Sequence, residues 1–385
     1  MLPKQCCCII VTARNVCRQV FTIVTALAIL AMVGCSNSGN DDSTSTPPPP
    51  SQPPGLLSIS GYYYSEPPPA NGADLALRLQ QVETLLQQAG VNAQFLSYRW
   101  SELEPTIGNY DAAKLSEFSY AMTYAQSQGF QQLVGLQIIN TVTREVPAEL
   151  VNTAWDDPAM INALHDLLDQ MLPQMRTTVR YLSIGNEVDG YFFAGRESEL
   201  NAYQLLVDGL KNYVQAQVPT IKVGITVTAN GWLGSNVQQV LNLTQNNDVL
   251  ITTYYPLNSD FTVKPADSPL ADFPALVNYT NGRPLVLQEV GYPSAPSLNS
   301  SETQQAQFIR NTFTAWRNSN SSITLLNLFL LHDFSTSLVD TFVLYYGVND
   351  PEFRAYLDTL GLRHRDNTDK AAWPAVVQEA ADAGF

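Results

Sequence analysis

Hydrophobic positions after Leu56 follow two alternating patterns. Short runs rich in Val, Ile, Leu, Thr and Tyr recur about eight times, and between them apolar residues return every three or four positions. The short runs are typical of buried strands and the longer segments of amphipathic helices. This alternation predicts a parallel sheet built from βα units. We expect strands at 56–62, 93–98, 132–138, 180–184, 222–227, 249–253, 285–288 and 323–331.

Local signals mark where several of the intervening helices begin and end. An apolar stripe stops at Gly90, which favours a helix C-terminus there. Asp157 followed by Pro158 indicates an N-cap with proline at the first helical position. Ser301 and Gln304 have the spacing of a capping box.

Eight βα units predict a closed (β/α)8 TIM barrel that occupies residues 56–385. An open, doubly wound sheet would give a similar alternation. The chain, however, has no Gly-x-Gly-x-x-Gly loop after the first expected strand, so the barrel is preferred.

The first 35 residues have the pattern of an export signal. Basic positions precede an apolar run from Val20 to Val33, which is shorter than the ~20 residues that a spanning helix needs. The end of this run, Met32-Val33-Gly34-Cys35, resembles the lipobox of bacterial lipoproteins. The resemblance implies lipidation of Cys35, a membrane anchor and, with Ser36 next, an exported protein of the cell envelope held at the outer membrane. Residues 36–55 are rich in Pro, Ser and Thr and predict an extended tether.

Charge and cysteine content exclude several classes of partner and chemistry. The net charge of −15 and a pI near 4.5 disfavour nucleic acid, and charged residues make up only 14%, which suits a neutral ligand such as a carbohydrate. No cysteine follows Cys35, so the main domain has neither disulfides nor thiol chemistry. Three histidines with no close pair predict no metal, and we expect no cofactor and a monomer.

Two glutamates stand where barrel enzymes place their reactive groups. Glu187 follows the fourth expected strand and Glu289 follows the seventh, and the carboxyl ends of all strands meet at one mouth. Cleavage of a glycosidic bond needs such a pair, because one carboxyl protonates the leaving oxygen while the other, ionised, meets the anomeric carbon. In a retaining mechanism the two carboxyls lie ~5–5.5 Å apart, and their environments are expected to separate their pKa values.

These residues resemble the retaining glycoside hydrolases of clan A, which carry Asn-Glu after strand four and Glu after strand seven. The resemblance implies that Glu187 is the general acid/base, that Asn186 binds the sugar 2-hydroxyl and that Glu289 is the nucleophile. The stretch from Glu289 to Ser294 resembles the corresponding stretch of the family 17 glycoside hydrolases. Residues 184–187 and 100–111 also resemble segments of glycoside hydrolase families 5, 39 and 53. The family, the sugar, the linkage and endo or exo action stay open, with a β-linked polysaccharide as the expected substrate.

The same resemblance suggests residues that support the pair. Arg99 is expected near Glu289, keeping it ionised, and Tyr254 is preferred over Tyr255 as the hydrogen-bond donor to Glu289. Many clan members have a tryptophan after strand eight, where this chain offers His332 or Phe334. Further aromatic residues are expected at the mouth, where they could stack on sugars: Tyr62, Tyr63, Tyr64, Trp100, Trp155, Tyr191, Phe192, Trp232 and Tyr292.

A second class of function also fits the pattern, namely a surface glycan-binding lipoprotein that keeps a degenerate barrel without turnover. The intact carboxylate pair favours the enzyme, because binding alone does not need Glu187 beside Asn186.

Asp333 is interpreted as an ordinary loop acid and 363–366 as a solvated charged run.

Overall fold

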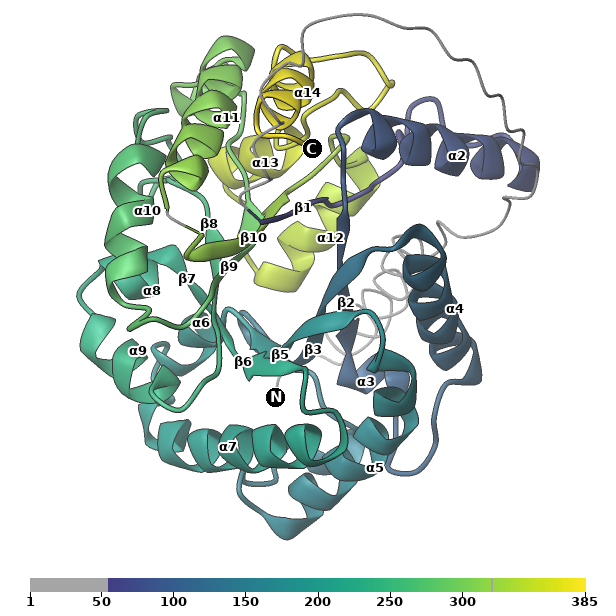
Figure 1. Ribbon diagram of the computed structural model, residues 1–385, viewed down its shortest axis with the longest axis vertical. Coiled ribbons are helices and arrows are strands. Elements are labelled where there is room, and N and C mark those ends of the chain that lie inside the picture. The colour runs from purple at the N-terminus through teal and green to yellow at the C-terminus, as the bar shows by residue number, and fades with distance from the viewer. Residues whose placement is uncertain (1–54, 320) are drawn as a thin grey trace, which may run out of the picture.

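The computed structural model describes residues 55–319 and 321–385, which form a ring of parallel strands surrounded by helices (Figure 1). Around the ring the strands follow the order β1, β2, β3, β5, β6/β7, β8, β9, β10. The predicted (β/α)8 barrel is therefore confirmed. The strands are β1 (Leu56–Ile59), β2 (Ala93–Arg99), β3 (Gln131–Asn140), β4 (Thr143–Arg144), β5 (Val179–Asn186), β6 (Lys222–Gly224), β7 (Thr226–Thr228), β8 (Leu250–Tyr254), β9 (Leu285–Val290) and β10 (Ile323–Leu328).

Helices on the outside of the ring begin and end where local chemistry predicts. Asp157 accepts a hydrogen bond from the Ala159 amide at the start of α5, and Ser301 accepts one from the Gln304 amide before α11. Gly90 follows α2 with a φ of +66°. The longer helices are α2 (Gly72–Gln88), α4 (Ala112–Gln128), α5 (Pro158–Met175), α7 (Leu200–Gln217), α9 (Val237–Thr244), α10 (Pro269–Asn278), α11 (Glu302–Arg317), α12 (Thr336–Tyr346), α13 (Pro351–Asp358) and α14 (Ala372–Asp382); the shorter ones are α3 (Trp100–Leu103), α6 (Val188–Phe192) and α8 (Ala229–Leu233).

The ring closes at one seam through side chains. Between β1 and β2, the Leu57 amide donates to Oδ1 of Asn92 at 2.8 Å, and the Asn92 amide donates back to the Leu57 carbonyl at 3.1 Å. The Phe95 amide donates to Oγ of Ser58 at 3.2 Å. These bonds satisfy backbone groups that a regular ladder would otherwise pair.

An insertion after β10 was not expected from the sequence. The chain forms α12 and α13 before it returns to the outer ring as α14, and α12 lies over the interior of the ring rather than outside it (Figure 1). Residues of this insertion form their own hydrophobic cluster, which includes Phe334, Leu338, Phe353 and Leu360. The cluster separates one side of the barrel mouth from solvent.

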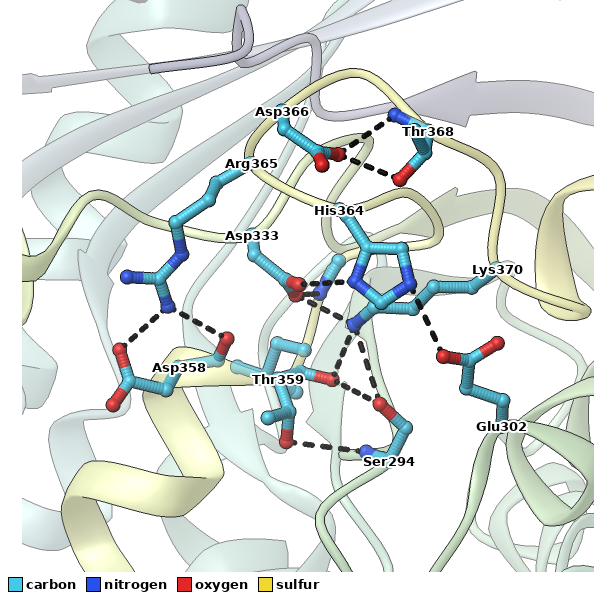
Figure 2. A network of polar contacts seen from close by, with 12 residues as sticks. Ser294, Glu302, Asp333, Asp358, Thr359, His364, Arg365, Asp366, Thr368 and Lys370 are labelled. Atoms are coloured by element: carbon cyan, nitrogen blue, oxygen red, sulfur yellow. Dashed lines mark hydrogen bonds and ion pairs between the residues drawn. The ribbon is translucent and has the colours of Figure 1, made fainter. Parts of the chain in front are cut away.

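A buried ion pair fastens both ends of this insertion (Figure 2). Lys370 Nζ donates to Asp333 Oδ1 at 2.7 Å, to Ser294 Oγ at 3.2 Å and to the Thr359 carbonyl at 3.1 Å. Asp333 precedes α12, Thr359 follows α13 and Ser294 follows β9, so one ammonium group joins three segments. The Gly361 amide adds a hydrogen bond to Asp333 at 2.8 Å.

Two interpretations of charged residues are thereby corrected. Asp333 is 4% exposed and paired, so it is not an ordinary loop acid. Within 363–366, Arg363 is buried and pairs with Asp369, and Arg365 pairs with Asp358 at 2.8 Å. Residues 363–366 were interpreted as solvated because the sequence alone does not show which acidic residues the fold brings against the two arginines.

The predictions that concern residues 1–54, including the lipidation of Cys35, fall outside the residues that the structure describes. Across residues 55–319 and 321–385 no helix has both the length and the hydropathy needed to cross a bilayer.

Candidate active site

One pocket of about 370 Å³ lies at the carboxyl ends of the strands. Its wall includes Glu187, which directly follows β5, and Glu289 on β9, together with Asn186 and Arg99. The volume is within the range of small-molecule sites. The structure therefore brings together the two glutamates that the sequence singled out, although they are far apart in the chain.

Glu187 is held in an uncommon backbone conformation. Its φ of +46° is left-handed, and Thr141, which contacts it, has a φ of +49°. Thr141 Oγ1 donates to Glu187 Oε2 at 2.8 Å and Thr253 Oγ1 donates to Glu187 Oε1 at 2.7 Å. Left-handed residues other than glycine cost free energy and concentrate at functional sites. Both carboxylate oxygens of Glu187 are thus oriented by hydroxyl groups on neighbouring strand ends.

Gly185 makes the turn into Glu187 sterically possible. Its φ is +93°, and a Cβ at this position would lie 2.6 Å from Oη of Tyr203 and 2.7 Å from Cγ1 of Val188. We expect Gly185→Ala to lower the free energy of unfolding by more than about 2 kcal/mol, measured by urea titration. Gly195→Ala is the control, because its φ of +91° is similar but nothing lies within 4 Å of the added carbon. Equal losses in the two variants would contradict the steric account.

Glu289 has one close hydrogen-bond donor. The Tyr255 hydroxyl donates to Glu289 Oε2 at 2.7 Å. Burial, and next the negative charge of Glu187, raise the pKa of Glu289 to about 7, while hydrogen bonds from Tyr255 and Gln288 oppose the rise. Because the two carboxyls influence one another, their protons belong to the pair.

A chain of side-chain hydrogen bonds inside the barrel connects Asn186 and Gln288, the residues that directly precede the two glutamates. Asn186 Nδ2 donates to Asn140 Oδ1 at 3.1 Å, and Asn186 Oδ1 accepts from Gln288 Nε2 at 2.7 Å. Gln288 Oε1 accepts from Thr226 Oγ1 at 2.7 Å, and Ser183 continues the chain. The orientation of the Asn186 amide is therefore fixed on the pocket wall.

The tyrosine that contacts the nucleophile position is Tyr255, so the preference for Tyr254 was wrong. Tyr254 donates instead to Asp272 Oδ2 on α10 at 2.7 Å and is 1% exposed. Its ring packs against Phe273 and Phe308, on the helical side of β8. Successive strand residues face opposite ways, so only one of the two can reach the pocket.

Arg99 lines the pocket as expected, but its predicted effect on Glu289 is not observed. Its ion-pair distances are 3.6 Å to Glu102 and 3.9 Å to Glu145, and its guanidinium lies 5.1 Å from the centre of the Tyr345 ring. The pKa of Glu289 is raised rather than lowered, because burial and the charge of Glu187 outweigh the hydrogen bonds from Tyr255 and Gln288.

Four other expected binding residues lie in the packed interior instead of on the pocket wall. Trp100 donates to Glu104 at 2.7 Å, Tyr292 donates to the Lys264 carbonyl at 2.8 Å, and Trp232 stacks on Tyr279 with ring centres 5.9 Å apart. These three are at most 1% exposed.

His332 is the fourth. Its ring nitrogens contact the Tyr62 carbonyl at 2.6 Å and Asn367 Oδ1 at 3.0 Å, and burial lowers its pKa to about 4. The alternative, Phe334, does line the pocket, as does Tyr62 from the set of expected stacking aromatics. Trp155 and Phe192 from that set pack around Tyr203 instead.

Two tyrosines of the insertion reach the site and were missed. Tyr346 on α12 and Tyr356 on α13 both line the pocket. The ring of Tyr356 packs edge-on against that of Tyr255, which donates to Glu289, with ring centres 5.6 Å apart. Glu289 is therefore connected to the insertion through Tyr255. No sequence pattern indicated this, because the contacts depend on how α12 and α13 fold back over the mouth.

The described part of the chain holds no group of three His, Cys, Asp or Glu side chains that could bind a metal ion.

No protein-family model and no curated protein sequence matches this chain. Solved structures do resemble it. An exo-β-1,4-mannosidase from Opitutaceae bacterium strain TAV5 is 16% identical with a TM-score of 0.63, and the match covers 85% of this chain and 59% of that one. GH5_18 from Streptomyces cattleya in complex with GlcNAc is 16% identical with a TM-score of 0.65, covering 87% and 81%.

A third structure, the β-glycosidase BGL167, is 12% identical with a TM-score of 0.58, covering 86% of this chain and 96% of that one. The chain therefore shares the fold of these solved glycosidase structures. At these identities the likeness concerns architecture, and it agrees with the resemblance carried by Asn186, Glu187 and Glu289.

Proposed function

We propose that this protein is a retaining glycoside hydrolase that uses Glu187 as general acid/base and Glu289 as nucleophile. The observation that carries the proposal is the placement of both carboxyls on the wall of one pocket at the mouth of the barrel. Glycosidic cleavage with retention needs one carboxyl as the acid and a second as the nucleophile on the same sugar ring.

In the first step, Glu187 gives its proton to the glycosidic oxygen while Glu289 attacks the anomeric carbon. The bond between that carbon and the leaving oxygen breaks, its electron pair stays on the oxygen, and the sugar becomes esterified to Glu289. In the second step, water gives a proton to Glu187 and attacks the same carbon, which releases Glu289 as a carboxylate. Two displacements at one carbon give net retention.

The surroundings of each glutamate fit these roles. Tyr255 donates to Glu289 and stabilises its anionic form. The hydroxyls of Thr141 and Thr253 can donate to Glu187 when it is ionised and accept from it when it is protonated. Glu187 can therefore change protonation state during each turnover without losing its contacts.

A single sugar ring would find polar partners on the same wall. Asn186 Nδ2 has a second N–H beyond the one given to Asn140. Gln137 lines the pocket, and its Oε1 has no hydrogen-bond partner within residues 55–319 and 321–385. We propose a β-linked hexose, in line with the β-mannosidase and β-glycosidase named above.

We propose further that the enzyme is exported and held at the cell envelope by a lipid on Cys35, so that it meets its substrates outside the cytoplasm.

Hydrolysis of a panel of β-glucosides and β-mannosides, followed by NMR of the first-formed anomer, tests the function. Retained β configuration is expected. Inversion would contradict the assignment of Glu289, and binding without any turnover would favour the glycan-binding alternative.

Tyr255→Phe should move the acidic limb of the pH profile. The nucleophile acts as an anion, so activity should rise as pH passes the pKa of Glu289, about 7. The Tyr255 hydroxyl lowers the pKa of Glu289, so its removal should shift this limb to higher pH and reduce kcat by about 10- to 100-fold. Tyr254→Phe is the matched control, because that hydroxyl serves Asp272. Equal profiles for the two variants would refute the role given to Tyr255.

A further inference from the structure

The wall of the pocket has two chemically different halves. The half formed by the strand ends carries Asn186, Glu187, Glu289 and other polar groups. The half formed by the insertion is largely apolar, built from Phe334, Leu338, Phe342, Phe353, Leu357 and Leu360 together with the tyrosines Tyr345, Tyr346 and Tyr356. These residues come from the segment before α12, from α12 and α13 themselves and from the segment after α13.

The apolar half does not suit a second sugar ring. An aromatic face can stack on a sugar, but Leu338, Leu357 and Leu360 offer neither a ring face nor a hydrogen-bond partner. Burying a hydroxyl without a hydrogen-bond partner costs about 1–3 kcal/mol. The affinity for a disaccharide would therefore fall with each sugar hydroxyl that is buried against these leucines. The polar half is sufficient for one sugar.

Space for a ligand exists against this wall. Phe329 and Phe342 remain partly accessible although they belong to the cluster of the insertion, and both line the pocket. The Phe342 ring lies 5.2 Å from that of Phe334. The accessible apolar surface therefore faces the cavity that also contains the two glutamates.

We propose that the insertion binds an apolar aglycone, so that the substrate is a single β-linked sugar attached to a hydrocarbon group rather than a polysaccharide. This inference rests on the proposed glycosidase function of the same pocket. The sugar occupies the polar half, with its anomeric carbon at Glu289, and the hydrocarbon group lies against α12 and α13.

The chain length of simple alkyl glycosides tests this directly. We would measure kcat/KM for methyl, butyl and octyl β-D-glucosides and β-D-mannosides below the micelle-forming concentration. The leaving alcohols have similar acidity, so differences report binding of the alkyl group. We expect kcat/KM to rise by up to about fourfold per buried methylene, from the ~0.8 kcal/mol that each contributes, and by at least about tenfold from methyl to octyl. Hexyl and cyclohexyl glycosides then distinguish a chain from a ring.

A variant of α12 connects the effect to the wall. Phe342→Ala should lower kcat/KM for the octyl glycoside by about tenfold and leave the methyl glycoside within about twofold. Leu344→Ala is the control, since Leu344 is on the same helix but is 60% exposed. If Phe342→Ala does not fold, the wild-type series remains a complete test.

The two proposals fail in different ways. Turnover that is equal for methyl and octyl glycosides overturns the apolar aglycone and leaves the glycosidase intact. If no glycoside is cleaved, the glycosidase proposal fails, and calorimetric binding of the octyl glycosides still tests the wall. Affinity that increases with chain length and is lost in Phe342→Ala supports the inference; no binding, or binding independent of chain length, overturns it.

Discussion

Glu289→Gln should lower kcat by about 10⁴-fold or more without loss of folded structure. Glutamine keeps the shape of the side chain and an oxygen for the Tyr255 hydroxyl, but it cannot attack the anomeric carbon. Because the folded protein raises the pKa of Glu289, the ionised form destabilises the fold as pH rises through about 7. We therefore expect the variant to be at least as stable as the wild type at pH 8, measured by thermal unfolding.

Glu187→Gln is the partner experiment and separates the two roles. An activated glycosyl fluoride does not need a proton on its leaving group, so its first step should be largely spared, whereas alkyl glycosides should lose about 10²- to 10⁴-fold. A loss of equal size on both substrates would contradict the acid role of Glu187. A Glu289→Gln variant that retains near-normal turnover would exclude the nucleophile role.

The largest effect on stability is expected at the buried pair behind the insertion (Figure 2). Lys370→Met leaves the Asp333 carboxylate buried without its cation, which typically costs about 3–5 kcal/mol. Burial already raises the pKa of Asp333 and lowers that of Lys370, so neither charge is tolerated alone. Urea unfolding measures the loss. Adding Asp333→Asn to Lys370→Met should recover part of it.

An exposed pair provides the control for this prediction. Arg354 and Asp340 are also 2.7 Å apart, but their side chains are 36% and 54% exposed. Arg354→Met should change the free energy of unfolding by less than about 1 kcal/mol. If Lys370→Met and Arg354→Met had equal effects, the buried pair would not be what fastens the insertion to the barrel.

Much of the barrel was predictable because its strands are continuous apolar runs. Such runs are typical of parallel strands that are buried on both faces of the sheet. The expected strand at 222–227 is divided into β6 and β7, and the other seven are single strands in the ring. Glu187 and Glu289 were predictable for a related reason, since a polar residue directly after such a run lies at the mouth of the barrel.

The choice between Tyr254 and Tyr255 could have been made from the alternation along β8. Val249 and Ile251 pack inside the barrel, and Thr253 on the same face contacts Glu187. Tyr255 continues this face, whereas Tyr254 follows Leu250 on the face that packs against the helices. The register shift between β8 and β9 leaves this alternation unchanged, because the extra residue, Gln288, lies in β9.

The insertion and the aromatic residues, by contrast, were unpredictable. Trp232 and Tyr292 follow strands, as sugar-binding residues often do, but helices packed around the barrel bury them. Conversely, Tyr346 and Tyr356 reach the site only because α12 and α13 fold back across the mouth. Such long-range packing leaves no local periodicity in the sequence.

The most direct test of the glutamate pair is covalent trapping. The protein would be incubated with 2-deoxy-2-fluoro-β-glucosyl and mannosyl fluorides and then digested for peptide mass spectrometry. We predict one added sugar on Glu289, within β9, and none in Glu289→Gln. Turnover of β-glycosides with no trapped sugar, or a sugar found on another residue, would contradict the account.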